Sequence, residues 1–204
     1  MQDAFASLMT RRVWFVAHDH LHDEYLIAGT QQVAIRPSPR TLYEKVRLLT
    51  PEAESALLLA SPTRRAQQTA ARLIPNAIWE SLDALSPQKF GEWEGRTWQE
   101  VREQDPARGE SYWNEYSRER APGGESLQDV AERLEHFLPG LINRPRWDRC
   151  VIVTHPEIIR VLICQILEIR LQQSLKLSIE PLSTTAISHS LLGWQVDGIN
   201  LLPQ

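Results

Sequence analysis

The sequence predicts an α/β fold, a three-layer sandwich in which helices flank a mostly parallel central sheet. Three short apolar segments bounded by polar residues, 13–17, 56–60 and 150–154, predict buried parallel strands. Helical patterns separate these segments, and alternation of strands with helices is typical of this class. A small helical insertion that forms a lid is predicted at about residues 90–125, where aromatic and charged residues gather around a Pro-Gly-Gly turn.

The pattern along the chain predicts the individual elements in turn. Residues 64–73 are helix formers throughout, which predicts a helix directly after the second strand. Residues 77–80 are a candidate fourth strand. Apolar residues at helical spacing predict a helix over 126–138, and the nearly all-apolar stretch 158–167 predicts a buried helix after the third parallel strand.

The last part of the chain predicts strands. Residues 175–179 and 186–194 have strand character, and Asp197-Gly198 follows them as a dipeptide typical of tight turns. We therefore predict a hairpin that bends through Asp197 and Gly198.

Length and composition predict one soluble domain that spans residues 1–204. The chain of 204 residues contains no run approaching the roughly 18 apolar residues of a membrane span. A net charge of −4 gives no electrostatic argument for a nucleic-acid partner. The first ten residues lack the pattern of a signal peptide, and Cys150 and Cys164 lie in apolar segments as free thiols would, so we expect a cytoplasmic protein.

Two histidines stand where predicted strands end. His18 follows the first strand and His155 follows the strand at 150–154. In open α/β sheets, ligands bind just outside the carboxyl ends of the strands. The two histidines therefore predict one shared site at this edge of the sheet.

Four segments, matching in order and spacing, resemble the histidine phosphatase superfamily, which includes cofactor-dependent phosphoglycerate mutases and α-ribazole phosphatases. The strongest is Ser61-Pro62-Thr63-Arg64-Arg65-Ala66-Gln67-Gln68-Thr69-Ala70, which opens the predicted helix. The others are Phe90–Gly95, Pro122–Ser126 and Val153–His155. The resemblance extends over roughly residues 12–200 and implies a phosphoglycerate mutase-like fold, because several motifs in one order are more specific than any single one.

The resemblance implies hydrolysis of a small phosphomonoester through a phosphohistidine. His18 would be the nucleophile, which requires an unprotonated imidazole. Arg65 and a protonated His155 would hold the phosphoryl group, since phosphoryl transfer needs fixed positive donors. Ser61 lies at the same expected phosphate site. No metal or organic cofactor is implied.

The chain departs from the family at two places. The Arg-His-Gly motif is altered to Ala17-His18-Asp19, and loss of an arginine–phosphate pair is expected to cost about 1.5–3 kcal/mol in binding. Ala17 and Asp19 both flank the expected phosphate, where Asp19 would add an unfavourable charge. The position of the proton-donating carboxylate falls on Pro87. The remaining candidate acids are Asp83, Glu92 and Glu94.

Other functions remain open at this stage. The chain is either a working phosphatase, a weakened or inactive relative that binds a phosphorylated ligand, or a protein in which alanine was introduced at position 17 to trap a complex. A different class of hydrolase would use His18, His20 and His22 as metal ligands, since alternating strand residues share a face. The sequence does not specify the substrate or the oligomeric state.

Overall fold

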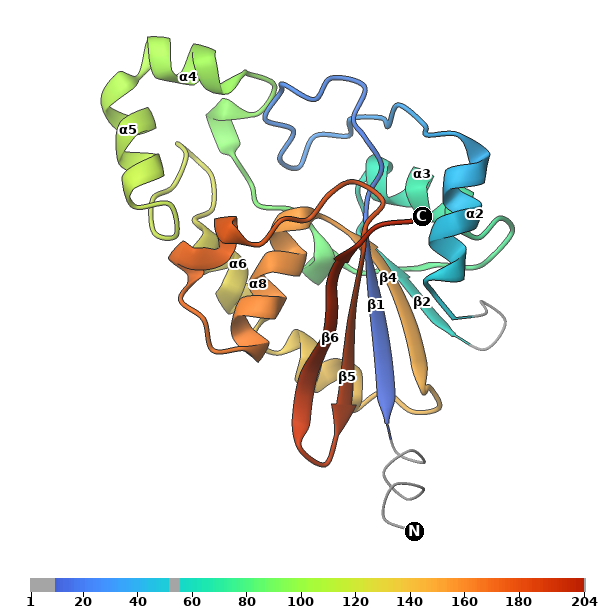
Figure 1. Cartoon of the computed structure of the whole chain (residues 1–204). Coiled ribbons are helices and arrows are strands. Elements are labelled where there is room, and N and C mark those ends of the chain that lie inside the picture. Colours follow the sequence, from blue (N-terminus) through green and yellow to red (C-terminus); the bar gives the residue numbers. More distant parts are fainter. Residues whose placement is uncertain (1–9, 52–55, 204) are drawn as a thin grey trace.

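The computed structural model describes residues 10–51 and 56–203, and it has the predicted three-layer α/β architecture. Its six-stranded sheet has the order β3-β2-β4-β1-β5-β6. The strands are β1 (Arg11–Ala17), β2 (Leu57–Ala60), β3 (Glu80–Ser81), β4 (Arg149–Thr154), β5 (Thr184–Ser190) and β6 (Gly193–Leu201). The strands β3, β2, β4 and β1 run parallel, and β5 and β6 complete the sheet as an antiparallel hairpin (Figure 1).

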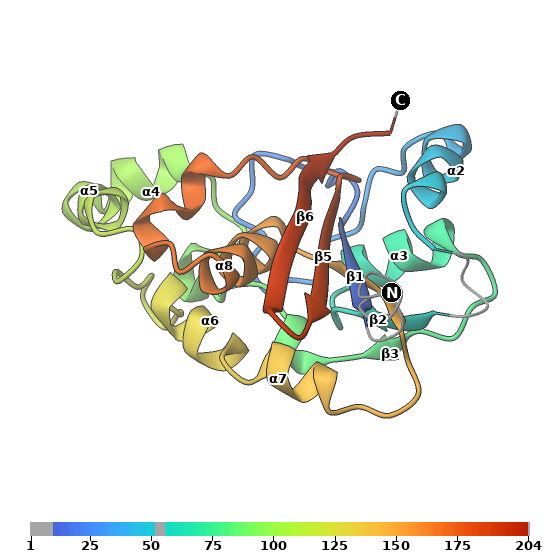
Figure 2. The same cartoon turned by 60° about the horizontal axis from the view of Figure 1, so that its bottom comes forward.

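Helices cover both faces of the sheet (Figure 2). One face packs against α6 (Leu127–Leu134), α7 (Phe137–Ile142) and α8 (Pro156–Ile166), and the other against α2 (Arg40–Leu48) and α3 (Arg64–Leu73). Side chains along β1 point alternately to the two faces of the sheet. Phe15 packs in the core on the α6–α8 side, and Val16 packs in the core on the α2–α3 side. The central strands are therefore buried on both sides, which explains their continuous apolar sequences.

The predicted insertion folds as a separate helical unit beside the sheet (Figure 1). It contains a short 3₁₀ turn (Gly91–Trp93), α4 (Trp98–Gln104) and α5 (Pro106–Asn114). Thr97 caps α4 in a capping box with Glu100, and Asp105 caps α5. Five aromatic residues of the unit pack in a small core of their own, namely Phe90, Trp93, Trp98, Tyr112 and Tyr116. The exposed Trp113 lies against this core and stacks on Tyr116.

Several predicted elements differ in the structure. The helix expected over 126–138 is divided into α6 and α7, because Pro139 lacks the N–H that would continue the hydrogen-bond ladder to residue 135. The candidate strand 77–80 is reduced to β3, which begins only at its last residue. The helix α2 and a 3₁₀ turn at Asp83–Leu85 were not predicted.

The end of the chain also differs from the prediction. Residues 171–176 form a 3₁₀ helix, η4, so the strand expected over 175–179 is wrong. The hairpin bends between Ser190 and Gly193, and Asp197 and Gly198 lie inside β6. A register shift where Gly198 faces Ala186 absorbs the dipeptide as a β-bulge, which is the other common use of glycine in a strand.

The two cysteines lie in the core, as their apolar segments predict. Cys150 and Cys164 are buried free thiols. None of the helices in residues 10–51 and 56–203 has the length and apolar character needed to cross a membrane.

Candidate active site

Three neighbouring parallel strands deliver the site residues to one edge of the sheet. His18 follows β1, Ser61 follows β2 and His155 follows β4, which lies between them. The strand ladder continues into these residues, because the His18 N–H donates to Thr154 O at 2.9 Å and the Ser61 N–H donates to Val153 O at 2.9 Å. The sheet backbone therefore fixes the positions from which these side chains project.

The predicted shared site is present. The rings of His18 and His155 meet edge to face with centroids 5.1 Å apart. Arg65, in the first turn of α3, donates from Nε to His155 Nδ1 at 3.3 Å. Its other donors reach the loop after β1, with Nη2 2.6 Å from Gly29 O and Nη1 3.0 Å from Gln31 O. Of the five guanidinium N–H groups, these bonds leave two for a further acceptor.

His18 has the hydrogen bonding of a nucleophile. Its Nδ1 lies 2.7 Å from Asp19 O, and a carbonyl can only accept, so Nδ1 carries the proton and Nε2 carries the lone pair. Burial, followed by the charge of Arg65, lowers the pKa of His18 to about 4. At neutral pH the imidazole is therefore neutral, with an unprotonated Nε2.

His155 is neutral as well, which corrects the expectation of a protonated imidazole. It is fully buried, and burial together with the charges of Arg65 and His18 lowers its pKa well below the usual range. Because Nδ1 accepts from Arg65, the proton lies on Nε2, which is 2.8 Å from Ser61 Oγ. In this structure Ser61 therefore positions His155, and Arg65 is the permanent positive charge of the site.

The pKa of His18 gives a prediction for titration. We expect the His18 imidazole to titrate near pH 4 in the folded protein and near 6.5 in urea, followed by NMR with a His18→Gln variant for assignment. Because the unfolded state binds this proton more tightly, His18 should also lower the free energy of unfolding as the pH falls from about 6.5 towards 4. A midpoint near 6.5 in the folded protein would contradict the buried, neutral imidazole.

The residues on either side of His18 do not face a ligand, which corrects both expectations. Ala17 and Asp19 have no exposed surface, and Ala17 packs in the core on the α8 side of the sheet. The Asp19 carboxylate accepts hydrogen bonds from the Ser38 N–H and hydroxyl, from the Tyr43 hydroxyl and from the His20 N–H. Asp19 is thus a structural carboxylate that holds the loop after His18, and its charge is balanced by protein donors.

The structure favours none of the three candidate acids named from the sequence. Asp83 and Glu92 are exposed. Glu94 accepts from the Thr30 N–H at 2.8 Å and from the Phe90 N–H at 3.0 Å, which ties together two loops beside the site. Pro87, at the family's acid position, is buried.

One carboxylate at the site was missed by the sequence analysis. Glu157 is in the first turn of α8, two residues after His155, and it is half-buried. Burial lowers the pKa of Arg65, and the negative charge of Glu157 opposes this effect. The contribution of Glu157 is larger than that of Glu94. The signal was available in His155-Pro156-Glu157, because the first turn of a helix that begins at a strand end lies beside the ligand site.

The histidines of the metal hypothesis are not brought together. His18 faces His155, while His20 bonds to Glu24 at the surface and His22 is exposed. Across residues 10–51 and 56–203 there is no group of three His, Cys, Asp or Glu side chains placed to hold a metal ion. The described geometry therefore does not support the alternating-histidine site.

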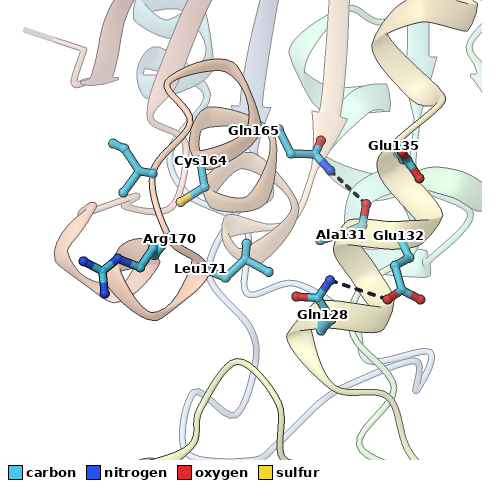
Figure 3. A pocket seen from close by; sticks show the side chains of 9 residues that line it. Gln128, Ala131, Glu132, Glu135, Cys164, Gln165, Arg170 and Leu171 are labelled. Atoms are coloured by element: carbon cyan, nitrogen blue, oxygen red, sulfur yellow. Dashed lines mark hydrogen bonds between the residues drawn. The ribbon is translucent and has the colours of Figure 1, made fainter.

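A surface hollow of about 440 Å³ lies between α6, α8 and η4, away from the strand-end residues (Figure 3). Gln165 crosses it to donate to Ala131 O, and Gln128 bonds to Glu132 on the same helix. None of the residues that line it is a predicted site residue. The histidines therefore mark a separate place in the fold.

Solved structures of known proteins share this fold. The putative α-ribazole-5′-phosphate phosphatase of Escherichia coli matches 93% of this chain and 96% of its own with a TM-score of 0.84 and 18% identity. A mycobacterial glucosyl-3-phosphoglycerate phosphatase matches 94% of this chain and 99% of its own with a TM-score of 0.80 and 22% identity. At these identities the likeness shows the fold alone.

Sequence comparison gives the family. The Saccharomyces cerevisiae fructose-2,6-bisphosphatase is 31% identical over 125 residues, which are 61% of this chain and 26% of that protein. A Caenorhabditis elegans 6-phosphofructo-2-kinase/fructose-2,6-bisphosphatase is 30% identical over 102 residues, 48% of this chain and 21% of that protein. The chain spans about a quarter or less of these curated relatives. The model of the histidine phosphatase superfamily (branch 1) matches residues 40–202, most of the chain, and the chain therefore belongs to that superfamily.

Proposed function

We propose that this chain hydrolyses a small phosphomonoester through a phosphohistidine formed on His18. The observation that carries the proposal is the hydrogen bond from His18 Nδ1 to Asp19 O, which leaves the Nε2 lone pair available beside Arg65. A neutral imidazole with its second nitrogen fixed by a carbonyl has the protonation state that nucleophilic attack requires.

The charge of the site suits a phosphoryl group. Arg65 is 3% exposed, and a buried guanidinium strengthens the interaction with a phosphate because little water screens it. Phosphoryl transfer develops charge on the equatorial oxygens, and the N–H groups that Arg65 has left would stabilise them. The Nε2–H of His155 is a further donor once a phosphate oxygen replaces Ser61 Oγ as its acceptor.

The relatives support a small organic phosphate as the substrate. Their names describe phosphatases of a sugar bisphosphate, of α-ribazole phosphate and of a glucosylated phosphoglycerate. The shared chemistry is a phosphate ester on a small polar molecule. Most aromatic side chains of the insertion fill its own core, whereas Trp113 is exposed and lines a hollow on the insertion with Trp98.

A second candidate is a protein that binds a phosphorylated ligand without turnover. The observation in its favour is that position 17 is a buried alanine, while two donors of Arg65 are engaged by Gly29 O and Gln31 O. Such a site would hold phosphate more weakly than one with two arginines. Binding of a phosphate ester with no release of phosphate would identify it.

The test is phosphate release from p-nitrophenyl phosphate and from a panel of alkyl phosphomonoesters, with EDTA present. We expect release that EDTA does not inhibit, because the proposed chemistry uses only side chains. If no ester is hydrolysed, the binding function takes its place. If hydrolysis occurs only without EDTA, the reaction depends on a metal ion and the proposal is wrong.

A further inference from the structure

The proposed reaction needs a proton that the described site residues do not supply. When the P–O bond to an alkyl group breaks, the leaving oxygen takes the electron pair and must be protonated to leave readily. His18 is the nucleophile, Arg65 does not give up a proton in proteins, and the Nε2–H of His155 is directed to Ser61. A separate proton donor is therefore required.

Glu157 lies close to the strand-end site. The helix α8 begins directly after His155, and Glu157 is the second residue of that helix. A half-buried side chain at this position is near the edge of the sheet where His18, Arg65 and His155 meet. In residues 10–51 and 56–203 it has no hydrogen-bond or ion-pair partner, so its carboxyl group is available.

The charge of Glu157 acts on groups from two parts of the fold. It acts on Arg65 and on two tyrosines of the helical insertion. Burial raises the pKa of Tyr116 to about 12, and the charge of Glu157 contributes to that rise. The same charge adds to the effect of burial in raising the pKa of Tyr112. The carboxylate is thus within electrostatic reach of both the phosphate-binding arginine and the insertion.

Asp83 and Glu92 are exposed, and the remaining carboxylates near the site already have partners. Glu125 accepts from the Lys89 N–H at 3.0 Å and pairs with Arg133 at 3.5 Å. Glu94 is bound by two backbone N–H groups, and Asp19 is buried behind the loop. Among the described acidic residues around the strand ends, Glu157 is the one that combines partial exposure with an unpaired carboxyl group.

We infer that Glu157 is the general acid of this site and replaces the carboxylate lost at Pro87. The inference rests on the proposed function. In the first step the His18 Nε2 lone pair forms a bond to phosphorus, the ester P–O bond breaks, and the leaving oxygen takes its proton from the Glu157 carboxyl. In the second step a water gives a proton to the Glu157 carboxylate and attacks phosphorus. The P–N bond then breaks, and its electron pair returns to His18.

After the leaving group departs with the proton, the carboxylate is the base that the water requires. One residue therefore serves both steps without a second acid.

The experiment compares Glu157→Gln with the wild-type chain on two kinds of ester. We expect alkyl phosphate turnover to fall by about 10²–10⁴-fold, while p-nitrophenyl phosphate turnover changes little, because p-nitrophenolate leaves without a proton. Glu157→Asp should recover part of the rate on the alkyl ester, because it restores a carboxyl group at this position.

The control is Glu110→Gln, a matched change at an exposed carboxylate on α5, and it should leave both rates unchanged. An equal loss on both esters, or no loss on the alkyl ester, would overturn the assignment of Glu157. If the wild-type chain hydrolyses neither ester, the proposed function is wrong, and Glu157 is then not a general acid. His18→Ala should lose both activities, which separates the nucleophile from the acid.

Discussion

Replacing His18 with alanine should abolish turnover, with a fall of about 10⁴–10⁶-fold in the rate of phosphate release. The reason is that His18 carries the only lone pair positioned for attack within the described site, since His155 Nδ1 accepts from Arg65. Water in place of the imidazole would have to attack directly, without the covalent intermediate that divides the reaction into two easier steps. The measurement is initial-rate phosphate release from p-nitrophenyl phosphate with EDTA present.

The matched control for this change is His20→Ala. His20 lies two residues along the same loop, but its ring bonds to Glu24 at the surface. We expect the His20 variant to keep the wild-type rate, and both variants to unfold at similar urea concentrations. A His18 variant that retains activity would show that the nucleophile is a different group, and equal losses in both variants would indicate a structural effect of the loop.

Replacing Asp19 with alanine should give the largest loss of stability, about 2–4 kcal/mol in the free energy of unfolding. The buried carboxylate accepts from four donors of Ser38, Tyr43 and His20, and its removal leaves these groups without partners. Burial, with the hydrogen bond to Asp19 second, raises the pKa of the Tyr43 hydroxyl, so this phenol stays protonated and remains a donor. The measurement is equilibrium unfolding in urea, followed by fluorescence.

Asp23→Ala is the control for this second change, because Asp23 is an exposed aspartate in the same loop. Its effect should be within about 0.5 kcal/mol, as is usual for exposed positions. Equal stabilities for the Asp19 and Asp23 variants would mean that the four hydrogen bonds contribute nothing, contrary to the structural role assigned to Asp19.

The central sheet was predictable because its strands are buried on both faces. Burial on both sides requires the uninterrupted apolar sequences of Val13–Ala17 and Cys150–Thr154, and such segments are visible without any knowledge of tertiary contacts. The helix α3 was predicted with its bounds because its residues favour a helix throughout. The division between α6 and α7 could also have been predicted from Pro139. We predicted one continuous helix because the apolar residues keep helical spacing across the break.

Errors in the sequence analysis arose where tertiary contacts override local preference. Asp197-Gly198 is typical of a hairpin turn, yet pairing with β5 places both residues inside β6. We predicted that Asp19 places a negative charge beside the phosphate. In the structure its carboxylate bonds instead to Ser38 and Tyr43, which lie about twenty residues later in the chain. No local pattern reports such a pairing.

The site itself was partly predictable. His18, Arg65 and His155 come together as the strand ends and the motifs indicated, because parallel strands bring their carboxyl ends to one edge. The protonation of His155 was predicted wrongly, since it depends on burial and on the charge of Arg65 in the folded chain. The sequence analysis did not name Glu157, because its candidate acids were taken from the segment on either side of Gly91, near the family's acid position.

The most direct test of this account is to trap the covalent intermediate. The chain would be mixed with a phosphomonoester, quenched in denaturant at alkaline pH within the first turnover, digested and analysed by mass spectrometry. Alkaline quenching preserves phosphohistidine. We predict one phosphoryl group on the peptide that contains His18, absent from the His18→Ala variant. A phosphoryl group on a different residue, or steady hydrolysis with no phosphorylated peptide at any time after mixing, would contradict the assignment of His18 as the nucleophile.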